Sequence, residues 1–379
     1  MTPQTALSQS PLDDLLNRIG GKLQITETMF FQAESRYHTI GEWLRAEGSP
    51  ISIFKPEIYP QGSLRIQTTV RPRGECEFDL DFVCEFKADP DSFYNPVEIL
   101  NIIEKRLRDN KIYEGMIERK NRCIRINYAN QFHMDILPAC PNPAAFNYGD
   151  TRLVIPDRDA RCWKHSNPKG YARWFDETAV ETATKLKRNV EPLPEQQTYE
   201  ELVTLKRAVQ LLKRHRDVSL DYLPEKERPI SIVLTTLAAQ NYYGQRSVVQ
   251  AIDDILEGII NSIPSSGRIV VLNPTNEQED LSERWDKNPQ LYITFVNWVR
   301  DFKIKWETLV ETRGIQNIKS ELEKMFGEKV TKEVVDDYVK SYEPLRNSGS
   351  LSVGKGSGII VPATTVSSIP IKKNTFYGD

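Results

Sequence analysis

The chain has 379 residues, of which 39% are hydrophobic and 27% are charged, and its 53 acidic and 50 basic residues nearly balance. This composition is typical of a soluble globular protein of about two domains, and the balanced charge argues against a large duplex-binding surface. No apolar run approaches the roughly 20 residues of a membrane span, and no secretory signal is recognisable at the N-terminus. Five scattered cysteines without a Cys-x-x-Cys pair indicate reduced thiols in a cytosol and argue against a zinc site.

The first 48 residues carry apolar positions at helical spacing. They predict a short helix from about residue 11, a break at Gly20-Gly21, and a longer helix that ends near Gly48. The next segment, ISIFKPEIYPQGS, predicts a strand and a turn, and a short helix is expected from Ser63 to about Thr69.

The stretch CEFDLDFVCEF predicts a strand with two unlike faces. Because side chains alternate along a strand, one face carries Phe78, Leu80 and Phe82, and the other carries Glu77, Asp79 and Asp81. A helix capped by Asn95 is expected next, followed by strands over 123–128 and 132–137. On the second of these strands Asp135 shares a face with His133 and Leu137.

The remaining chain is expected to be loop-rich over 141–200, then helical to 343, and to end in a flexible Gly/Ser/Thr-rich tail. Together these elements predict a mixed α/β (α+β) fold. The predicted domains are N-terminal helices (1–48), a sheet domain (49–195), a helical C-terminal lobe (196–344) and the tail (345–379).

Two acids on one strand face repel each other unless a cation lies between them. Asp79 and Asp81, at positions i and i+2, present adjacent carboxylates, and Asp135 on a later strand could complete the cage. Hard carboxylate oxygens are the ligands that Mg²⁺ or Mn²⁺ prefers, and two such ions can serve phosphoryl-transfer chemistry. The sequence therefore predicts a site for two Mg²⁺ or Mn²⁺ ions.

The Gly62-Ser63 turn supports the same chemistry. A glycine lets a phosphate approach the backbone, and N–H groups entering a helix attract anions. Either motif alone is weak, and a solvated strand face beside a polar turn is the alternative. The order of Gly-Ser, then Asp-x-Asp about 16 residues later, then a lone Asp on another strand favours a nucleotide site.

This constellation resembles the polymerase-β-like nucleotidyltransferases. The longer segments QGSLRIQTTVRP, EFDLDFVCEF, HMDILPA and SNPKGYARWF resemble the bacterial cGAS/DncV-like enzymes, the CD-NTases of CBASS anti-phage systems, over roughly residues 20–345. Residues 270–285 are moderately similar to a segment in the C-terminal lobe of oligoadenylate synthase relatives. The resemblance implies a palm sheet packed on long N-terminal helices, with a helical lobe.

The resemblance also implies contacts to a nucleoside triphosphate. Besides Gly62 and Ser63, it points to Gln61, and to Lys213 on a helix where Lys206 and Arg207 are competitors. Ser231, at the start of the next helix, matches a serine near the phosphates, although an N-cap would also explain it.

Selection of the base is less legible from the sequence. Asn167 and Tyr171 are candidates for a base pocket, while Tyr59 could equally pack in the core. The arginines near the predicted site stay open between binding phosphate and balancing Glu75 and Glu77; they are Arg65, Arg71 and Arg73.

The expected partners are nucleoside triphosphates, ATP or GTP, with no membrane. No nucleic-acid activator is expected, because the chain lacks the basic insertion and zinc-binding cluster of animal cGAS. The tail resembles those joined to targets by ubiquitin-E1/E2-like partners, which would act near Gly378, although Asp379 departs from a small-residue end.

The leading hypothesis is a metal-dependent, cytoplasmic nucleotidyltransferase that condenses triphosphates into a cyclic di- or trinucleotide messenger. Asp79, Asp81 and Asp135 would hold both ions, and Asp135 would deprotonate the attacking hydroxyl. One alternative is linear transfer, as in oligoadenylate synthesis, RNA tailing or protein nucleotidylation. The other is a non-catalytic nucleotide-binding or scaffold protein.

Overall fold

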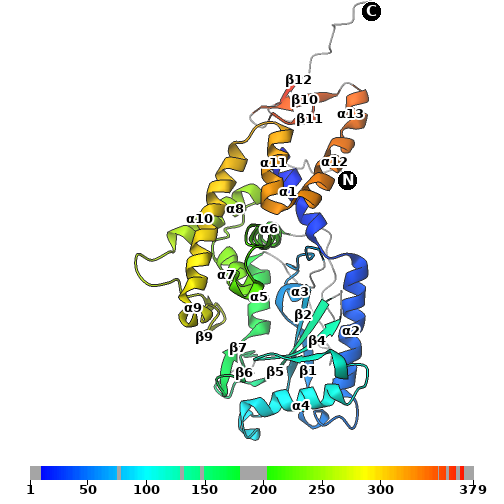
Figure 1. Ribbon diagram of the computed structural model, residues 1–379, viewed down its shortest axis with the longest axis vertical. Helices are drawn as coiled ribbons and strands as arrows, with labels where there is room; N and C mark the ends of the chain where they lie inside the picture. Colours follow the sequence, from blue (N-terminus) through cyan, green and yellow to red (C-terminus); the bar gives the residue numbers. More distant parts are fainter. Residues whose placement is uncertain are drawn as a thin grey trace, which may run out of the picture. The chain divides into compact units, whose positions relative to one another are not determined.

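The chain folds into two compact units, and it passes between them more than once (Figure 1). A computed structural model describes residues 10–74, 78–128, 132–145, 149–179, 203–348, 350–355, 358–363 and 368–370. The sheet unit comprises the described residues within 24–197 and 270–287, and the helical unit comprises those within 1–23, 198–269 and 288–379. None of the helices in these ranges has the length and apolar character that a membrane crossing needs.

The sheet unit alternates strands with helices. Its helices are α2 (Glu27–Arg45), α3 (Gly62–Arg65), α4 (Pro96–Arg108), α5 (Pro168–Thr178) and α9 (Arg284–Lys287). Its strands are β1 (Glu57–Pro60), β2 (Phe78–Glu85), β3 (Ile117–Arg119), β4 (Ile124–Tyr128), β5 (Phe132–Pro141), β6 (Leu153–Asp157), β7 (Cys162–Ser166), β8 (Leu272–Asn273) and β9 (Asn276–Asp280).

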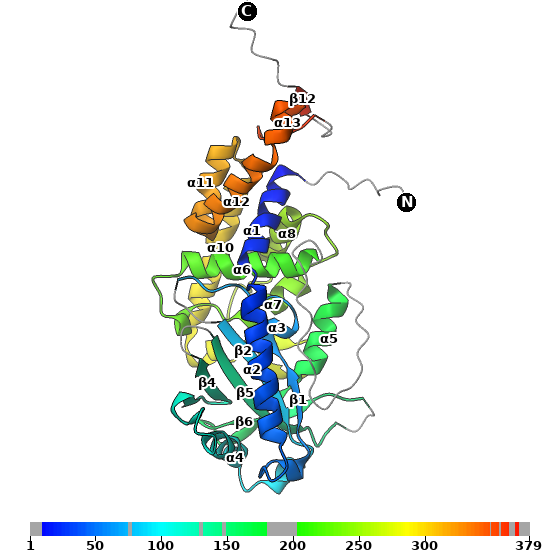
Figure 2. The same ribbon diagram turned by 90° about the vertical axis from the view of Figure 1, so that its right-hand side faces the viewer.

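The main sheet has seven strands in the order β1-β2-β5-β4-β3, with β6 beside β5 and β7 beside β6. The central pair, β2 and β5, is parallel, and β4 runs antiparallel to β5. One face of these strands is apolar and packs with α2 and α4 in a buried core. In that core the ring of Tyr37 on α2 meets the ring of Phe82 edge-on, 5.4 Å between centroids. Figure 2 looks onto this face, where α2 crosses in front of the strands.

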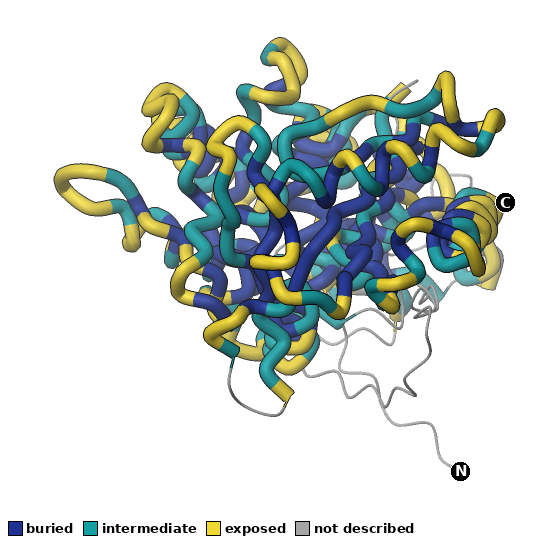
Figure 3. The backbone as a smooth tube through the Cα atoms, turned by 90° about the horizontal axis from the view of Figure 1, so that it is seen from below, coloured by how far each residue is buried: buried dark blue, intermediate teal, exposed yellow. Residues whose placement is uncertain are grey.

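The helical unit is built around α6. Its helices are α1 (Pro11–Leu23), α6 (Thr204–Ser219), α7 (Ser231–Gln240), α8 (Val248–Asn261), α10 (Pro289–Glu311), α11 (Ile315–Phe326), α12 (Glu328–Ser341) and α13 (Glu343–Asn347). Helices α1, α7, α8, α10 and α11 all contact α6. For the described residues of both units, Figure 3 shows buried segments of the backbone inside and exposed ones on outward turns.

The two units divide the chain differently from the predicted domains. The predicted N-terminal pair of helices is split, because α1 packs in the helical unit, where Asp13 accepts hydrogen bonds from the hydroxyl of Ser247 and the amide of Val249 (both 3.0 Å). Residues 270–287, expected in the C-terminal lobe, join the sheet unit, where Glu283 pairs with Lys164 and Arg122.

Three local predictions also differ from the structure. Helix α1 continues through Gly20-Gly21, and the break comes later, where the side chain of Thr26 caps α2 by accepting from the amide of Met29. The expected helix after Ser63 ends early, at Arg65. Residues 141–200 contain β6, β7 and α5, and not only loops. All five residues of β6 are buried, so this strand lacks the alternation that marks a half-buried strand.

The predicted flexible tail is partly ordered. It contains β10 (Leu351–Gly354), β11 (Ile360–Pro362) and β12 (Ser368–Pro370), in the order β11-β10-β12. Ile359 and Val361 are buried, and the hydroxyl of Tyr338 donates to the carbonyl of Ile360 at 3.4 Å. A few alternating apolar residues among Gly and Ser are therefore enough to form these strands, which contact α12 through Tyr338. Gly378, the predicted conjugation site, lies outside the described residues.

A fully buried histidine lies in the core of the helical unit. The imidazole of His215 on α6 stacks on Phe302 of α10, with ring centroids 3.6 Å apart and planes at 13°. Neither ring nitrogen has a hydrogen-bond partner within the described part of the chain. Burial, together with the charge of Lys305, lowers the pKa of His215 from 6.5 to about 3.

This histidine should make the helical unit sensitive to acid. Because the pKa is lower in the folded state, the unfolded chain binds more protons between pH 6.5 and about 3. The stability that the neutral imidazole of His215 contributes is complete above pH 6.5. It is lost as the pH falls below that value, by at most about 1.4 kcal/mol per pH unit. We predict that His215→Phe, which keeps the ring stack and removes the titrating group, loses less stability than the parent chain from pH 7 to pH 5 in urea unfolding. Equal losses in both proteins would contradict this account.

Candidate active site

Three aspartates share the face of the sheet opposite the hydrophobic core. The parallel register of β2 and β5 pairs Asp81 with Asp135, and Asp79 with His133. Because side chains alternate along both strands, the three carboxylates project to the same side, as the sequence predicted. The side chain of Asp79 is 47% exposed, whereas that of Asp135 is 14% exposed. The acids therefore range from the open edge of the site to its floor.

An arginine that the sequence reasoning missed binds two of these acids. Arg125 on β4 lies opposite Asp135 in the antiparallel register. Its Nε donates to one oxygen of Asp135 at 2.7 Å and its Nη2 to the other at 2.8 Å, while Nη2 also reaches Asp79 Oδ1 at 3.2 Å. Burial works against the charge of this guanidinium, but the bonds and charges of Asp135 and Asp79 outweigh it and raise the pKa of Arg125.

The thiol of Cys123 lies close to these carboxylates, and burial and their negative charge both raise its pKa. Burial raises the pKa of Cys123, and the charges of Asp135 and Asp81 raise it further, well above the usual range of a thiol. Only a thiolate is a good nucleophile, so Cys123 stays protonated and is not suited to covalent catalysis. The same shift shows that Asp81 and Asp135 act on one small region of the sheet face.

The Gly62 turn lies directly against the acids. Gly62 has φ +63°, and a Cβ at this position would come within 2.4 Å of Asp81 Oδ2. The amide of Gln61 donates to the carbonyl of Asp81 at 2.9 Å. Glycine is therefore required at position 62 both by the backbone conformation and by the close carboxylate. The two motifs that the sequence placed about 16 residues apart are neighbours in space.

The hydroxyl of Ser63 is held beside the same turn. Its Oγ lies 3.1 Å from Thr69 Oγ1, and the amide of Thr68 donates to the carbonyl of Ser63 at 2.8 Å. These bonds fix the loop that follows α3. The structure thus brings together six of the predicted site residues: Gln61, Gly62, Ser63 and the three aspartates.

Arg65, one of the arginines that the sequence left open, ties α3 to α5. Its Nη1 lies 3.0 Å from Asp176 Oδ2, and both side chains are largely buried. This ion pair gives Arg65 a partner in the sheet unit that the sequence did not suggest, because Asp176 is 111 residues away. Glu75 and Glu77, the partners considered first, lie outside the described residues.

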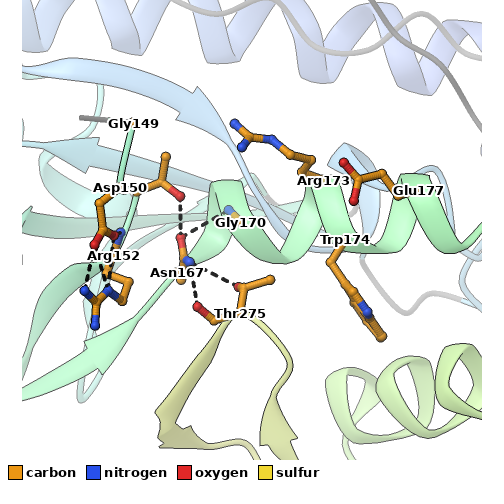
Figure 4. A pocket seen from close by; sticks show the side chains of 10 residues that line it. Gly149, Asp150, Arg152, Asn167, Gly170, Arg173, Trp174, Glu177 and Thr275 are labelled. Atoms are coloured by element: carbon orange, nitrogen blue, oxygen red, sulfur yellow. Dashed lines mark hydrogen bonds and ion pairs between the residues drawn. The ribbon is translucent and has the colours of Figure 1, made fainter. Parts of the chain in front are cut away.

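Asn167, a predicted base contact, has a structural role at the start of α5 (Figure 4). Its side-chain oxygen accepts from the hydroxyl of Thr151 at 2.8 Å and from the amide of Gly170 at 3.1 Å. Its nitrogen donates to the carbonyl and hydroxyl oxygens of Thr275, both at 3.1 Å. All donors and acceptors of this amide are engaged, and its role as a nucleotide contact stays a prediction.

A cavity of about 310 Å³ opens next to Asn167. Its wall includes Thr275, the partly exposed indole of Trp174, and an ion pair between Asp150 and Arg152 of 2.7 Å (Figure 4). Tyr171, the other predicted base contact, is buried with its ring centroid 5.4 Å from that of Trp174. Four charged residues line the cavity, Asp150, Arg152, Arg173 and Glu177, and the sequence singled out only Asn167 among its lining.

The remaining predicted site residues belong to the helical unit. Lys213 is buried on α6, as is its competitor Lys206, whereas Arg207 donates to Asn17 on α1 at 3.0 Å. Ser231 begins α7, but the N-cap position is Ile230, and the hydroxyl of Ser231 accepts from Arg216 Nη1 at 2.9 Å. The N-cap interpretation of Ser231 is therefore wrong. The predicted role of Lys213 and Ser231 as triphosphate contacts stays a prediction.

The residue types on the sheet face fit a divalent cation. Three carboxylates supply hard oxygen ligands on adjacent strands, and the glycine at position 62 lets the carboxylate of Asp81 lie against the turn. As the side chains stand, no three His, Cys, Asp or Glu side chains within the described ranges are placed to hold a metal ion. In this arrangement the guanidinium of Arg125 donates to both oxygens of Asp135 and to one of Asp79. The carboxylates that could bind a cation are present, and the guanidinium of Arg125 places one positive charge among them.

Comparison with known proteins identifies relatives along the whole chain. A family model described as "Second Messenger Oligonucleotide or Dinucleotide Synthetase domain" matches residues 11–178, which include all three aspartates. A c-di-GMP synthase from Roseivirga ehrenbergii is 33% identical over 386 aligned positions that cover 99% of each chain. The cyclic dinucleotide synthase CdnG from Bradyrhizobium diazoefficiens is 25% identical, covering 97% of this chain and 95% of that one.

The fold agrees with a solved structure of the same kind. The CD-NTase CdnG of Bradyrhizobium diazoefficiens in complex with GTP superimposes with a TM-score of 0.68, at 22% identity over 87% of this chain and 99% of that chain. At this identity the likeness shows the fold alone. The predicted mixed α/β class, with a sheet and a helical lobe, is confirmed.

The contact between Gly62 and Asp81 can be tested with a matched pair of variants. We predict that Gly62→Ala is markedly less stable than Gly74→Ala in thermal unfolding. Both glycines have nearly the same left-handed φ (+63° and +61°), which costs an alanine about 1–3 kcal/mol in either place. Only at position 62 does the added Cβ also meet a carboxylate, since nothing lies within 4 Å of a Cβ at Gly74. Equal losses of stability would rule out the close approach of Asp81.

Proposed function

The chain belongs to the bacterial cGAS/DncV-like nucleotidyltransferases, the CD-NTases, and on that premise we propose that it condenses two GTP molecules into the cyclic dinucleotide c-di-GMP. The enzyme class and its cyclic dinucleotide chemistry follow from the family. The choice of GTP rests on the c-di-GMP synthase to which the chain is 33% identical along its whole length. CBASS anti-phage signalling is the setting in which such messengers are made.

The observation that carries the catalytic part of this proposal is the strand register. It sets Asp81 beside Asp135 and leaves Asp79 at the more exposed edge, all on the sheet face away from the core that α2 and α4 cover. A protein that only bound nucleotide would need no three carboxylates there, because they repel a triphosphate. Their arrangement favours an enzyme that binds the triphosphate together with cations.

Mg²⁺ or Mn²⁺, two ions in our proposal, would be held by Asp79, Asp81 and Asp135 and would supply the positive charge that steadies the triphosphate and the leaving pyrophosphate. Asp135 lies deeper than Asp79, with side chains 14% and 47% exposed, and we assign to its carboxylate the proton of the attacking ribose hydroxyl. The hydroxyl oxygen then forms a bond to the α-phosphorus while the bond from that phosphorus to pyrophosphate breaks. Two such transfers close the ring and release two pyrophosphates.

The Gly62-Ser63 turn is proposed to bind the donor triphosphate. Its place beside Asp81 means that phosphate bound at its backbone would lie next to the acids. Ser63 contributes a hydroxyl that is already oriented by Thr69, so that little side-chain freedom is lost on binding. Gln61 enters the same turn and completes the proposed phosphate contacts in the sheet unit.

Product analysis tests this function. We predict that the purified chain with Mg²⁺ or Mn²⁺ converts labelled GTP, without other nucleotides, into a product that resists phosphatase and has the mass of c-di-GMP. The double variant Asp79→Asn/Asp81→Asn should lose at least about 10³-fold in rate, because it removes the ligands for the cations. Asp337→Asn is the control, since its carboxylate pairs with Lys22 within the helical unit, at residues that no predicted site includes.

Other products would redirect the interpretation. A phosphatase-sensitive chain, or label transferred to RNA or protein, would support linear transfer. Absence of any product with all four nucleoside triphosphates would favour a non-catalytic nucleotide-binding protein. A resistant product that requires ATP as well as GTP would keep the enzyme class and contradict the proposed base choice.

A further inference from the structure

We propose that Arg125 is a built-in counter-cation of the acid triad, which holds the carboxylates in place without metal and must be displaced before a divalent ion can bind Asp135. This inference rests on the proposed function for the identity of the acids as metal ligands. Arg125 on β4 belongs to neither the Gly-Ser nor the Asp-x-Asp motif. In this proposal it controls when the metal binds.

The three carboxylates need a positive charge close to them. Three carboxylates on one sheet face repel one another, and the repulsion grows where they leave water. Arg125 is largely buried, with its side chain 19% exposed, and it bridges Asp135 and Asp79. Its charge does not depend on pH in the physiological range, because a guanidinium stays protonated. A fixed positive charge therefore offsets the repulsion in the absence of metal.

The guanidinium of Arg125 occupies the oxygens of Asp135 that a metal ion would use. Arg125 donates in parallel to both oxygens of Asp135, the bidentate arrangement that makes arginine–carboxylate pairs strong and directional. A metal ion needs lone pairs of the same two oxygens. It would also lie next to a positive guanidinium, at a cost that is large at short range. Binding of the ion to Asp135 and the full ion pair with Arg125 thus exclude each other.

The ion pair of Arg125 and Asp135 can open toward solvent. The contact of Arg125 with Asp79, 3.2 Å, is longer than its contacts with Asp135. The side chain of Asp79 is also the more exposed of the two acids, at 47% against 14%. The guanidinium can therefore leave Asp135 toward the open edge of the site while its backbone stays in the register of β4 and β5. No strand movement is needed.

The consequence is a coupling between metal and nucleotide. Without nucleotide, each divalent ion competes with Arg125 and binds weakly. A triphosphate brings several negative charges to the same face, which attract the ions and offer the guanidinium another partner. We infer that metal and triphosphate bind together, so that the acids stay paired with Arg125 in the resting protein.

The test measures binding of Mn²⁺ alone to the full chain, without nucleotide, by the loss of the electron paramagnetic resonance signal of free Mn²⁺. We predict that Arg125→Gln binds Mn²⁺ about tenfold more tightly than the parent chain. In the absence of metal the same variant should unfold a few degrees lower, because the acids lose their counter-charge. Mn²⁺ should then raise its unfolding temperature more than that of the parent chain.

Arg122→Gln is the matched control. Arg122 lies three residues earlier, and its guanidinium pairs with Asp157 and Glu283, away from the triad. Its loss should lower stability and leave Mn²⁺ affinity unchanged. The double variant Arg125→Gln/Asp135→Asn should lose the gain in affinity, which would locate the tighter site at Asp135.

Equal or weaker Mn²⁺ binding by Arg125→Gln would overturn the proposal. If that variant does not fold, Arg125→Lys decides, because it keeps the charge and lacks the fork that spans both oxygens; we expect a smaller gain in affinity, and no gain would overturn the proposal. The product assay is independent of this test. A chain that makes c-di-GMP without the Mn²⁺ response would contradict this inference alone, and the reverse result would contradict the proposed function alone.

Discussion

The repulsion among three carboxylates on one sheet face is the constraint on which this structure depends. The parallel register of β2 and β5 fixes the acids at neighbouring positions, so they cannot separate without breaking the centre of the sheet. Arg125 supplies a positive charge from the adjacent strand, and it does so through the register of β4 and β5. The site is thus a property of strand pairing, and one of its three negative charges is offset by Arg125 before any ligand arrives.

The surrounding elements make this face rigid and accessible. Apolar side chains on one face of the same strands are buried against α2 and α4. The acids lie on the other face, next to a smaller buried cluster that includes Val83, Leu137 and Ala139. The Gly62 turn can lie against Asp81 only because position 62 has no Cβ. Helix α5 is tied to α3 by Arg65 and Asp176, and its first turn is capped by Asn167, which also binds the segment that carries β8 and β9.

Local patterns in the sequence predicted the acids and the turn, because alternation along a strand and the special conformation of glycine act over a few residues. Arg125 was missed although it belonged to a correctly predicted strand, since only the pairing of β4 with β5 shows which acid it meets. Asn167 was predicted to bind nucleotide, which stays a prediction; two of the four hydrogen bonds of its side chain reach Thr275, 108 residues away, and no local pattern indicates that contact. Strand β6 was missed because a strand buried on both faces has no alternation, and β10–β12 because their apolar residues are few among Gly and Ser.

The central claim is that the three aspartates form a metal-dependent catalytic site whose resting counter-charge is Arg125. Crystals of the full chain with Mn²⁺ and a non-hydrolysable GTP analogue test it most directly, through the anomalous scattering of manganese. The account predicts anomalous peaks among Asp79, Asp81 and Asp135, with the guanidinium of Arg125 withdrawn from Asp135. Bound nucleotide without manganese at these carboxylates, or manganese there with the ion pair of Arg125 and Asp135 intact, would contradict it.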